Sequence, residues 1–168
     1  MTVMNPKQLA EWYEAYGAEL LLFARQLTDA QQADDIVQEA FIKLLGEGRP
    51  PDNARAWLYR VVRNEAVSFM RRLRLKRRVS ERLGGAAEPC FESRGEDLID
   101  AQTVQSLLET LAKPQRGIVV LRIWGQLTLQ ETAGIVNKPV STVHYLYQTA
   151  LEKMRQTLEQ SSCTTKKK

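Results

Sequence analysis

Basic side chains with helical spacing are the first feature of chemical interest in this sequence. Arg60, Arg63 and Asn64 lie one turn apart, and six of the eight residues 71–78 are arginine or lysine. Cations placed so closely repel one another unless water, salt ions or phosphate groups screen them. Such a run could bind the phosphates of a nucleic acid, which would add affinity without recognising the base sequence. The alternative is a solvated basic helix end. The candidate phosphate contacts in the run are Arg71, Arg72 and Arg74.

An acidic block precedes the basic one along the chain. Asp34, Asp35, Gln38 and Glu39 fall on one side of a predicted helix, opposite its apolar stripe. Taken alone, they suit the positive end of the helix dipole and a solvated surface. Net charge alternates along the chain, from −5 over residues 1–48 and +8 over 49–78 to −5 over 79–112 and +6 over 113–168. This alternation favours different surfaces for different partners.

A third segment has the layout of two helices joined by a tight turn. Thr128 and Glu131 have the spacing of a capping box, in which the glutamate reaches back to the start of its helix. Asn137 tolerates the left-handed turn conformation, and Ser141 can cap a second, longer helix. In a helix-turn-helix, the second helix presents its N-terminal residues to base edges in the major groove. A plain helical hairpin with a well-capped core is the alternative interpretation.

Nearly every periodic segment has the 3.6-residue spacing of a helix, and no run alternates as a strand does. Apolar stripes predict helices over about 9–27, 33–44 and 54–72, each ended by a turn or by a glycine and proline cluster. Beyond residue 97, the pattern predicts a short helix that stops near Lys113, one that begins at Pro114 and ends near Gly125, and the capped pair. The predicted fold is all-α.

The chain is predicted to contain two small helical domains on a flexible linker. Residues 79–97 are rich in glycine and polar residues and have little to bury, so they form the expected linker. The domains are expected at 1–78 and 98–160, the second containing the helix-turn-helix, with a frayed tail at 161–168.

Composition excludes several classes of protein. With 43% hydrophobic and 26% charged residues, the chain is an ordinary globular sequence, and no stretch approaches the roughly 20 apolar residues of a membrane span. The start lacks an apolar signal segment, so we expect a cytoplasmic protein without membrane insertion. Cys90 and Cys163 are expected to be free thiols, and His144, the single histidine, cannot assemble a zinc site. No catalytic constellation is present, so we expect neither enzyme activity nor a cofactor.

Four blocks in chain order resemble the extracytoplasmic-function (ECF) sigma factors of bacterial RNA polymerase, and the match covers residues 9–157. YEAY at 13–16 with LFARQLT at 22–28 resembles the opening helix of the family, and ADDIVQEAFIKL at 33–44 is very similar to its polymerase-binding motif. RAWLYRVVRN at 55–64 resembles the helix that handles the proximal, minus-ten promoter element. The capped pair of helices resembles the domain that reads the upstream, minus-thirty-five element.

The resemblance implies a role for each block. The acidic face would dock on the clamp helices of the polymerase β′ subunit, with Ile42 and Lys43 at its periphery. Asn64 matches a family position near a captured, unpaired base. Trp57 and Tyr59 could stack on unpaired bases, although the apolar spacing predicts a core position for Trp57.

The recognition helix departs from the family pattern, which places several arginines or lysines after the Thr-Val pair at 142–143. Gln148 could contact adenine, and Thr149 or Leu146 a thymine methyl group, whereas phosphate anchoring would depend on Lys138, Arg122 or Arg116. The candidate contacts to the upstream element are Lys138, Ser141, Thr142, His144, Tyr145, Gln148 and Thr149.

The sequence therefore predicts a dissociable promoter-specificity subunit of bacterial RNA polymerase. The resemblance also implies control by an anti-sigma protein that masks these surfaces. One rival is a stand-alone helix-turn-helix regulator, which would not need the acidic helix. Another is a protein adaptor that has lost upstream-element reading and uses Tyr145 and Leu146 to bind a partner.

Overall fold

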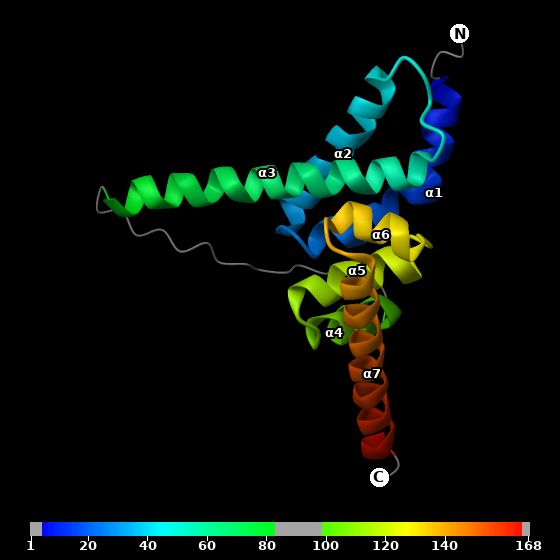
Figure 1. Ribbon diagram of the computed structural model, residues 1–168, viewed down its shortest axis with the longest axis vertical. Helices are drawn as coiled ribbons and strands as arrows, with labels where there is room; N and C mark the ends of the chain where they lie inside the picture. Colours follow the sequence, from blue (N-terminus) through cyan, green and yellow to red (C-terminus); the bar gives the residue numbers. More distant parts are fainter. Residues whose placement is uncertain (1–4, 83–98, 166–168) are drawn as a thin grey trace. The chain divides into compact units, whose positions relative to one another are not determined.

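The computed structural model describes residues 5–82 and 99–165, which form seven helices and contain no strand (Figure 1). The predicted all-α class is confirmed. The chain divides into two compact units, the first containing α1 to α3 and the second α4 to α7. None of the described helices is long and apolar enough to cross a bilayer. The helices are α1 (Pro6–Arg25), α2 (Ala30–Gly46), α3 (Ala54–Arg82), α4 (Ile99–Glu109), α5 (Lys113–Ile123), α6 (Leu129–Val136) and α7 (Val140–Thr165).

In the first unit, α1, α2 and α3 pack against one another around an apolar core. The apolar stripes of all three helices meet there, because apolar residues with a 3.6-residue period lie on one face of a helix and that face turns toward the core. The fully buried large side chains of this core include Leu20, Phe23, Leu44, Leu58 and Val62.

Side-chain caps fix where the helices of the first unit begin. Asn5 accepts a hydrogen bond from the backbone N–H of Lys7 at 3.0 Å, and Pro6 occupies the first turn of α1. Asp29 accepts from the N–H of Gln32 at 2.9 Å, so α2 begins at Ala30, a few residues before the start predicted at 33. Each cap satisfies a backbone donor that the first helical turn leaves without a partner.

Helix α3 is longer than its apolar pattern predicts. Its expected end was near residue 72, whereas it continues to Arg82 and carries the whole basic run 71–78 on helical backbone. Arginine and lysine are good helix formers, so charge repulsion does not end the helix when the side chains remain in water. The helix also enters the range 79–97 expected to be linker, and the rest of that range lies outside the described residues.

The second unit is built around α7, on which α5 and α6 pack. Its core cluster contains Ile118, Ala133 and Val143, with Leu146 and Tyr147 partly buried against it. The expected tail at 161–168 is helical as far as Thr165. Helix α7 begins at Val140, so Ser141 lies inside the first turn and not at the predicted cap position.

The start of α6 and the turn between α6 and α7 both have the predicted chemistry. The Thr128 hydroxyl accepts from the Glu131 N–H at 3.1 Å, while the Glu131 carboxylate accepts from the Thr128 N–H at 2.7 Å. Asn137 adopts the left-handed conformation, with φ 55° and ψ 52°. The capping box and the turn therefore define a helix-turn-helix at α6 and α7.

Substitution of Asn137 tests this turn. Asn137→Val should lower the unfolding free energy of the second unit by about 1–2 kcal/mol, because a β-branched residue is strained at positive φ. Asn137→Gly should change it by less than about 0.5 kcal/mol. Hydrogen-exchange protection of α6 and α7 in the full chain measures both, and equal effects of the two variants would contradict this account.

Candidate functional site

The acidic side chains of α2 form an exposed ridge. Asp34, Asp35, Gln38 and Glu39 are all exposed, while Ile36, Val37 and Ala40 on the opposite face are buried in the core. Ile42 continues the ridge and leaves 63% of its surface in solvent. An exposed isoleucine beside a line of carboxylates is suited to a protein partner with basic and apolar side chains.

Lys43 connects this ridge to α3. Its ammonium group lies 4.0 Å from the Glu39 carboxylate and forms an ion pair with Glu65 of α3. The Glu65 side chain is only 26% exposed, so the ion pair with Lys43 lies at the junction of the two helices. Lys43 therefore connects α2 to α3 across the edge of their apolar packing, a contact that its position in the sequence does not indicate.

The predicted nucleic-acid residues of α3 are mostly exposed. Arg60 and Asn64 are exposed, whereas Trp57 and Arg63 are half-buried. Trp57 is thus neither a full core residue nor a freely accessible ring. Farther along the helix, the exposed side chains are Arg71, Arg72 and Arg74, followed by Lys76, Arg77 and Arg78.

The expectation that Tyr59 stacks on an unpaired base is wrong. Tyr59 has no exposed surface, and its ring meets the Phe23 ring edge-on with centroids 5.4 Å apart. The residue lies three positions before Val62 and seven before Ala66, which places it on the buried stripe of α3. A base cannot reach a ring that is enclosed in the core.

Tyr59 belongs to a largely buried polar cluster between α1 and α3. The Arg55 guanidinium lies 2.9 Å and 3.2 Å from the two carboxylate oxygens of Glu19 and 4.8 Å from the centre of the Tyr16 ring. Burial raises the pKa of Glu19, and the Arg55 charge opposes this shift. Burial, and next the Glu19 charge, raise the pKa of the Tyr59 phenol. The cluster joins α1 to α3 and is not accessible to a ligand.

In the second unit, α7 presents an uncharged polar face. Ser141, His144, Tyr145 and Gln148 are exposed and recur at the spacing of one helix face. Tyr145 leaves 66% of its surface in solvent. Lys138 in the turn is exposed beside this face, and Thr142 is half-buried.

The structure excludes two residues from the predicted upstream contacts. The Thr149 hydroxyl accepts a hydrogen bond from Gln115 of α5 at 3.0 Å and donates to the Tyr145 carbonyl at 3.0 Å. The expectation that Thr149 contacts a base is therefore wrong, since it faces α5. Leu146 packs against the core cluster and does not form an exposed pair with Tyr145.

The arginines expected to anchor phosphate near α7 instead stabilise the second unit itself. Arg116 donates to the carbonyls of Leu111 and Glu109, at 2.8 Å and 3.0 Å. Arg122 donates to the Leu127 carbonyl and lies 5.3 Å from the centre of the Tyr147 ring. Both guanidinium groups therefore take part in contacts within the second unit.

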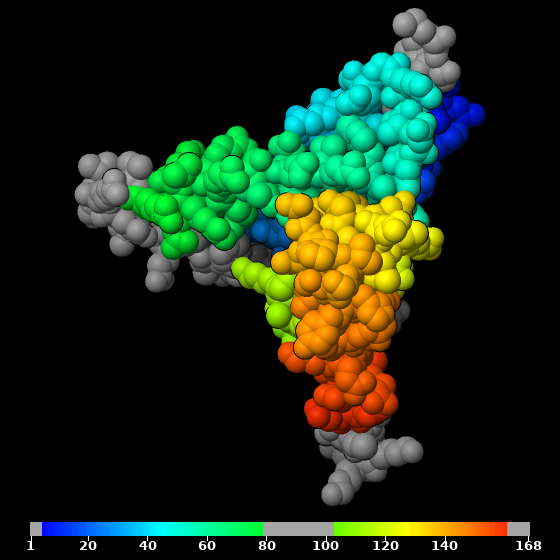
Figure 2. All heavy atoms as spheres, viewed as in Figure 1, coloured from blue at the N-terminus to red at the C-terminus, as the bar shows by residue number. Residues whose placement is uncertain are grey.

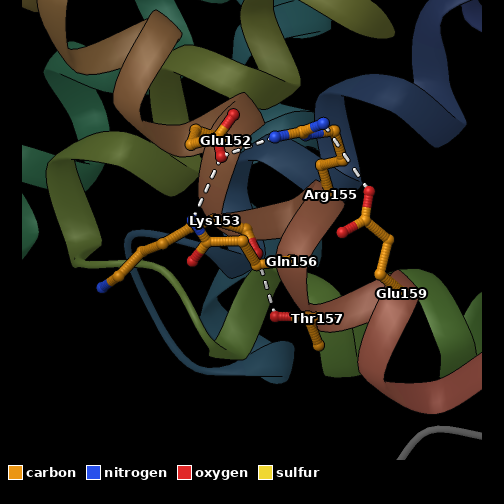
Figure 3. Close-up of polar contacts among 6 residues, drawn as sticks. All are labelled: Glu152, Lys153, Arg155, Gln156, Thr157 and Glu159. Atoms are coloured by element: carbon orange, nitrogen blue, oxygen red, sulfur yellow. Dashed lines mark hydrogen bonds and ion pairs between the residues drawn. The ribbon is translucent and has the colours of Figure 1, made fainter. Parts of the chain in front are cut away.

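The C-terminal half of α7 also pairs its charges internally (Figure 3). Arg155 contacts Glu152 at 2.8 Å and Glu159 at 3.6 Å, and Gln156 donates to Glu152 at 3.1 Å. Hydrogen bonds from Arg155 and then Gln156 lower the pKa of Glu152. These exposed pairs leave little net charge on this part of the helix.

Within residues 5–82 and 99–165, no three histidine, cysteine, aspartate or glutamate side chains lie close enough to hold a metal ion. Cys90 lies outside the described residues, as does the side chain of Cys163.

Comparison with known proteins assigns both units. Residues 12–76 match the family model of sigma-70 region 2, and residues 101–154 match that of sigma-70 region 4. The RNA polymerase sigma-E factor of Streptomyces avermitilis is 31% identical over 90% of this chain and 86% of its own length. The ECF RNA polymerase sigma factor SigL of Mycobacterium tuberculosis is 29% identical over 90% of this chain and 89% of its own length.

Solved structures agree on the fold. The sigma factor RpoE from Bartonella quintana, solved with the anti-sigma factor NepR, has a TM-score of 0.67 and 23% identity over 92% of this chain and 98% of its own. CnrH, solved with the cytosolic domain of CnrY, has a TM-score of 0.62 and 21% identity over 92% of this chain and 90% of its own.

A region 2 unit with an exposed acidic ridge, followed by a region 4 unit with a helix-turn-helix, defines a sigma subunit of RNA polymerase. The chain belongs to the sigma-70 family, and within that family it is an ECF sigma factor.

Proposed function

We propose that this sigma factor directs core RNA polymerase to specific promoters and begins to open the duplex there. The exposed ridge of α2, packed beside the basic helix α3 and connected to it by the Lys43–Glu65 ion pair, is the observation that carries the proposal. One unit then offers a protein-docking surface and a nucleic-acid surface on adjacent helices. The chain has no catalytic role of its own, and it works in the cytoplasm where polymerase and promoter meet.

The docking surface would contact the β′ clamp of the polymerase. Its members are Asp34, Asp35, Gln38, Glu39 and Ile42. Their charges suit a basic partner, and Ile42 supplies an apolar contact that the ridge itself does not bury. Lys43, next to this surface, forms the ion pair with Glu65 of α3.

The DNA surfaces would lie on both units. On α3, Asn64 would hydrogen-bond a base of the proximal element after it leaves the stack, while nearby arginines hold phosphates. On α7, Ser141, His144, Tyr145 and Gln148 would face the upstream element, with Lys138 beside them. We propose domains at 1–78 and 98–160, so that the intervening segment spans the two elements.

A protein regulator is a further proposed partner. Two proteins of similar fold were solved with protein partners, RpoE with the anti-sigma factor NepR and CnrH with the cytosolic domain of CnrY. An anti-sigma protein that covers the ridge of α2 or the exposed face of α7 would keep this chain from polymerase or promoter.

Run-off transcription tests the function. Core polymerase with the purified chain, on a library of promoter fragments, should initiate on a subset of templates that core polymerase alone does not use. Initiation on none of them would contradict the proposal and favour a protein adaptor. Tight binding to duplex DNA by a chain that does not co-purify with core polymerase would instead indicate a stand-alone regulator.

Gln148→Ala should reduce initiation about tenfold on a promoter that the library identifies, because a bidentate contact to adenine contributes about 1–3 kcal/mol. The salt dependence of promoter binding should not change, since the lost side chain is neutral. Quantitative run-off and promoter binding at several salt concentrations measure the two effects. Gln156→Ala, an exposed change farther along α7, is the matched control. Equal activity of the two variants would remove Gln148 from the interface.

A further inference from the structure

Gln115 of α5 is a buried amide with both of its ends in use. The side chain leaves only 9% of its surface in solvent. Its carbonyl oxygen accepts a hydrogen bond from the Ala112 N–H at 3.1 Å, and its amino group donates to the Thr149 hydroxyl of α7 at 3.0 Å. Because a backbone N–H can only donate, this arrangement fixes which end of the amide faces α7. Gln115 therefore joins the start of α5 to one position of α7.

Thr149 carries this contact to the preceding turn of α7. Its hydroxyl accepts from Gln115 and donates to the carbonyl oxygens of Tyr145 and Leu146, at 3.0 Å and 3.1 Å. Tyr145 precedes Thr149 by one turn and is 66% exposed, and the exposed Gln148 is next to Thr149 in the chain. The turn of α7 that bears two of the proposed base contacts is thus hydrogen-bonded to the interior of its unit.

The other contacts between α5 and α7 are less directional. Ile118 of α5 and Val143 of α7 are fully buried in the core cluster. Burial of apolar surface has no direction, so it selects the rotation of α7 less sharply than a hydrogen bond does. Arg122 lies over the Tyr147 ring, an attraction to a face and not along one donor–acceptor line. In Figures 1 and 2, α7 (orange to red) turns one long side toward the viewer, and no other helix of its unit covers that side.

Resting on the proposed function, we propose that Gln115 and Thr149 are positioning residues that set how α7 is turned toward the upstream element. Neither side chain would touch DNA, because Gln115 is buried and Thr149 faces α5. A small rotation of α7 would carry its exposed side chains away from the base edges, and hydrogen bonds to bases weaken steeply with angle. Loss of the pair should therefore lower the preference for the correct upstream element more than it lowers initiation in general.

The preference is measured as a ratio, which a purely structural role does not change. A promoter identified from the library is compared with a copy in which the upstream element is replaced, by run-off transcription with the full chain and core polymerase. Thr149→Val keeps the size of the side chain but removes the hydroxyl. It should lower the ratio about tenfold, which corresponds to the loss of one good base contact. Partial unfolding would lower initiation on both templates and leave the ratio unchanged.

Three further variants identify the contact that matters. Thr149→Ser retains the hydroxyl, so its ratio should remain within about twofold of wild type. Thr157→Val is the matched control, because the Thr157 hydroxyl also donates to a carbonyl of its own helix, that of Lys153 at 3.0 Å, farther along α7 (Figure 3). It should keep the ratio too. Gln115→Leu should lower the ratio as much as Thr149→Val, and the double variant should lower it no further, because all three lose the same contact.

A Thr149→Val ratio equal to that of wild type, or an equal fall in Thr157→Val, would overturn the proposal. A wild-type chain that initiates but shows no preference between the two templates would overturn it as well, while the proposed function would stand. If the wild-type chain initiates on no template, the proposed function fails, and the angle between α5 and α7 is then measured by residual dipolar couplings in the labelled full chain. A changed angle in Thr149→Val, but not in Thr149→Ser or Thr157→Val, supports the positioning role, and an unchanged angle overturns it.

Discussion

Replacing Asp35 with lysine is expected to abolish binding of the chain to core RNA polymerase while leaving its helix content unchanged. Asp35 is exposed at the middle of the ridge, and it makes one weak contact at 3.5 Å with Gln32 of its own helix. The fold therefore loses little when the side chain changes. A lysine there would meet the basic surface proposed for the partner, and like charges across an interface cost several kcal/mol, or about 100-fold or more in affinity.

Glu11→Lys is the matched control, because it makes the same change of charge at an exposed position on α1. Titration of labelled core polymerase with each variant, alongside circular dichroism, separates docking from folding. Unchanged affinity of the Asp35 variant would show that the ridge is not the docking surface. An equal loss in both variants would mean that net charge, and not the ridge, governs binding.

Removal of the Arg55 charge should destabilise the first unit more than removal of its partner. Arg55→Met leaves the Glu19 carboxylate largely buried without a cation, and we expect a loss of roughly 2–3 kcal/mol of unfolding free energy. Glu19→Gln should cost less, because the long Arg55 side chain retains its contact with the Tyr16 ring. Denaturant unfolding followed by hydrogen exchange in α1 and α3 measures both.

The pH dependence of the unfolding free energy shows whether Arg55→Met is destabilised by the buried Glu19 charge or by lost packing. Burial already raises the pKa of Glu19, and loss of Arg55 would raise it further. The folded state then holds the Glu19 proton more tightly than the unfolded state does. The deficit of Arg55→Met should therefore be full above the folded-state pKa of Glu19 and shrink as the pH falls through that pKa towards the unfolded-state value. A deficit independent of pH, or one equally present in the Glu19→Gln, Arg55→Met double variant, would contradict this explanation.

Helical periodicity predicted most of the fold because apolar residues at 3.6-residue spacing mark a buried face in any helix. The caps at Asp29, Thr128 and Asn137 follow from local chemistry, and each is found where the residue type indicates. The end of α3 did not follow, because a basic run neither buries a face nor breaks a helix. Burial of Tyr59 was available from its spacing to Val62, but its aromatic ring, in a block that resembles the helix handling the proximal element, favoured the stacking hypothesis.

Tertiary contacts between polar side chains explain the remaining differences between the roles predicted from the sequence and the contacts found in the structure. The Glu19–Arg55 pair connects residues 36 positions apart, and Gln115–Thr149 connects residues 34 apart. A hydropathy pattern assigns such residues to the surface because they are charged or polar. Arg116 and Arg122 were assigned to phosphate anchoring for the same reason, although they bind backbone carbonyls of their own unit.

The ion pair between Lys43 and Glu65 has a consequence for where a transcript begins. It connects the helix proposed to bind the polymerase with the helix proposed to hold the opened strand, and the two helices share one apolar core. Because α2 and α3 lie in one compact unit, the melted element would then sit at a constant distance from the surface that docks on the polymerase. Transcription would then start at a fixed number of nucleotides from that element, independent of the sequence between the element and the start site.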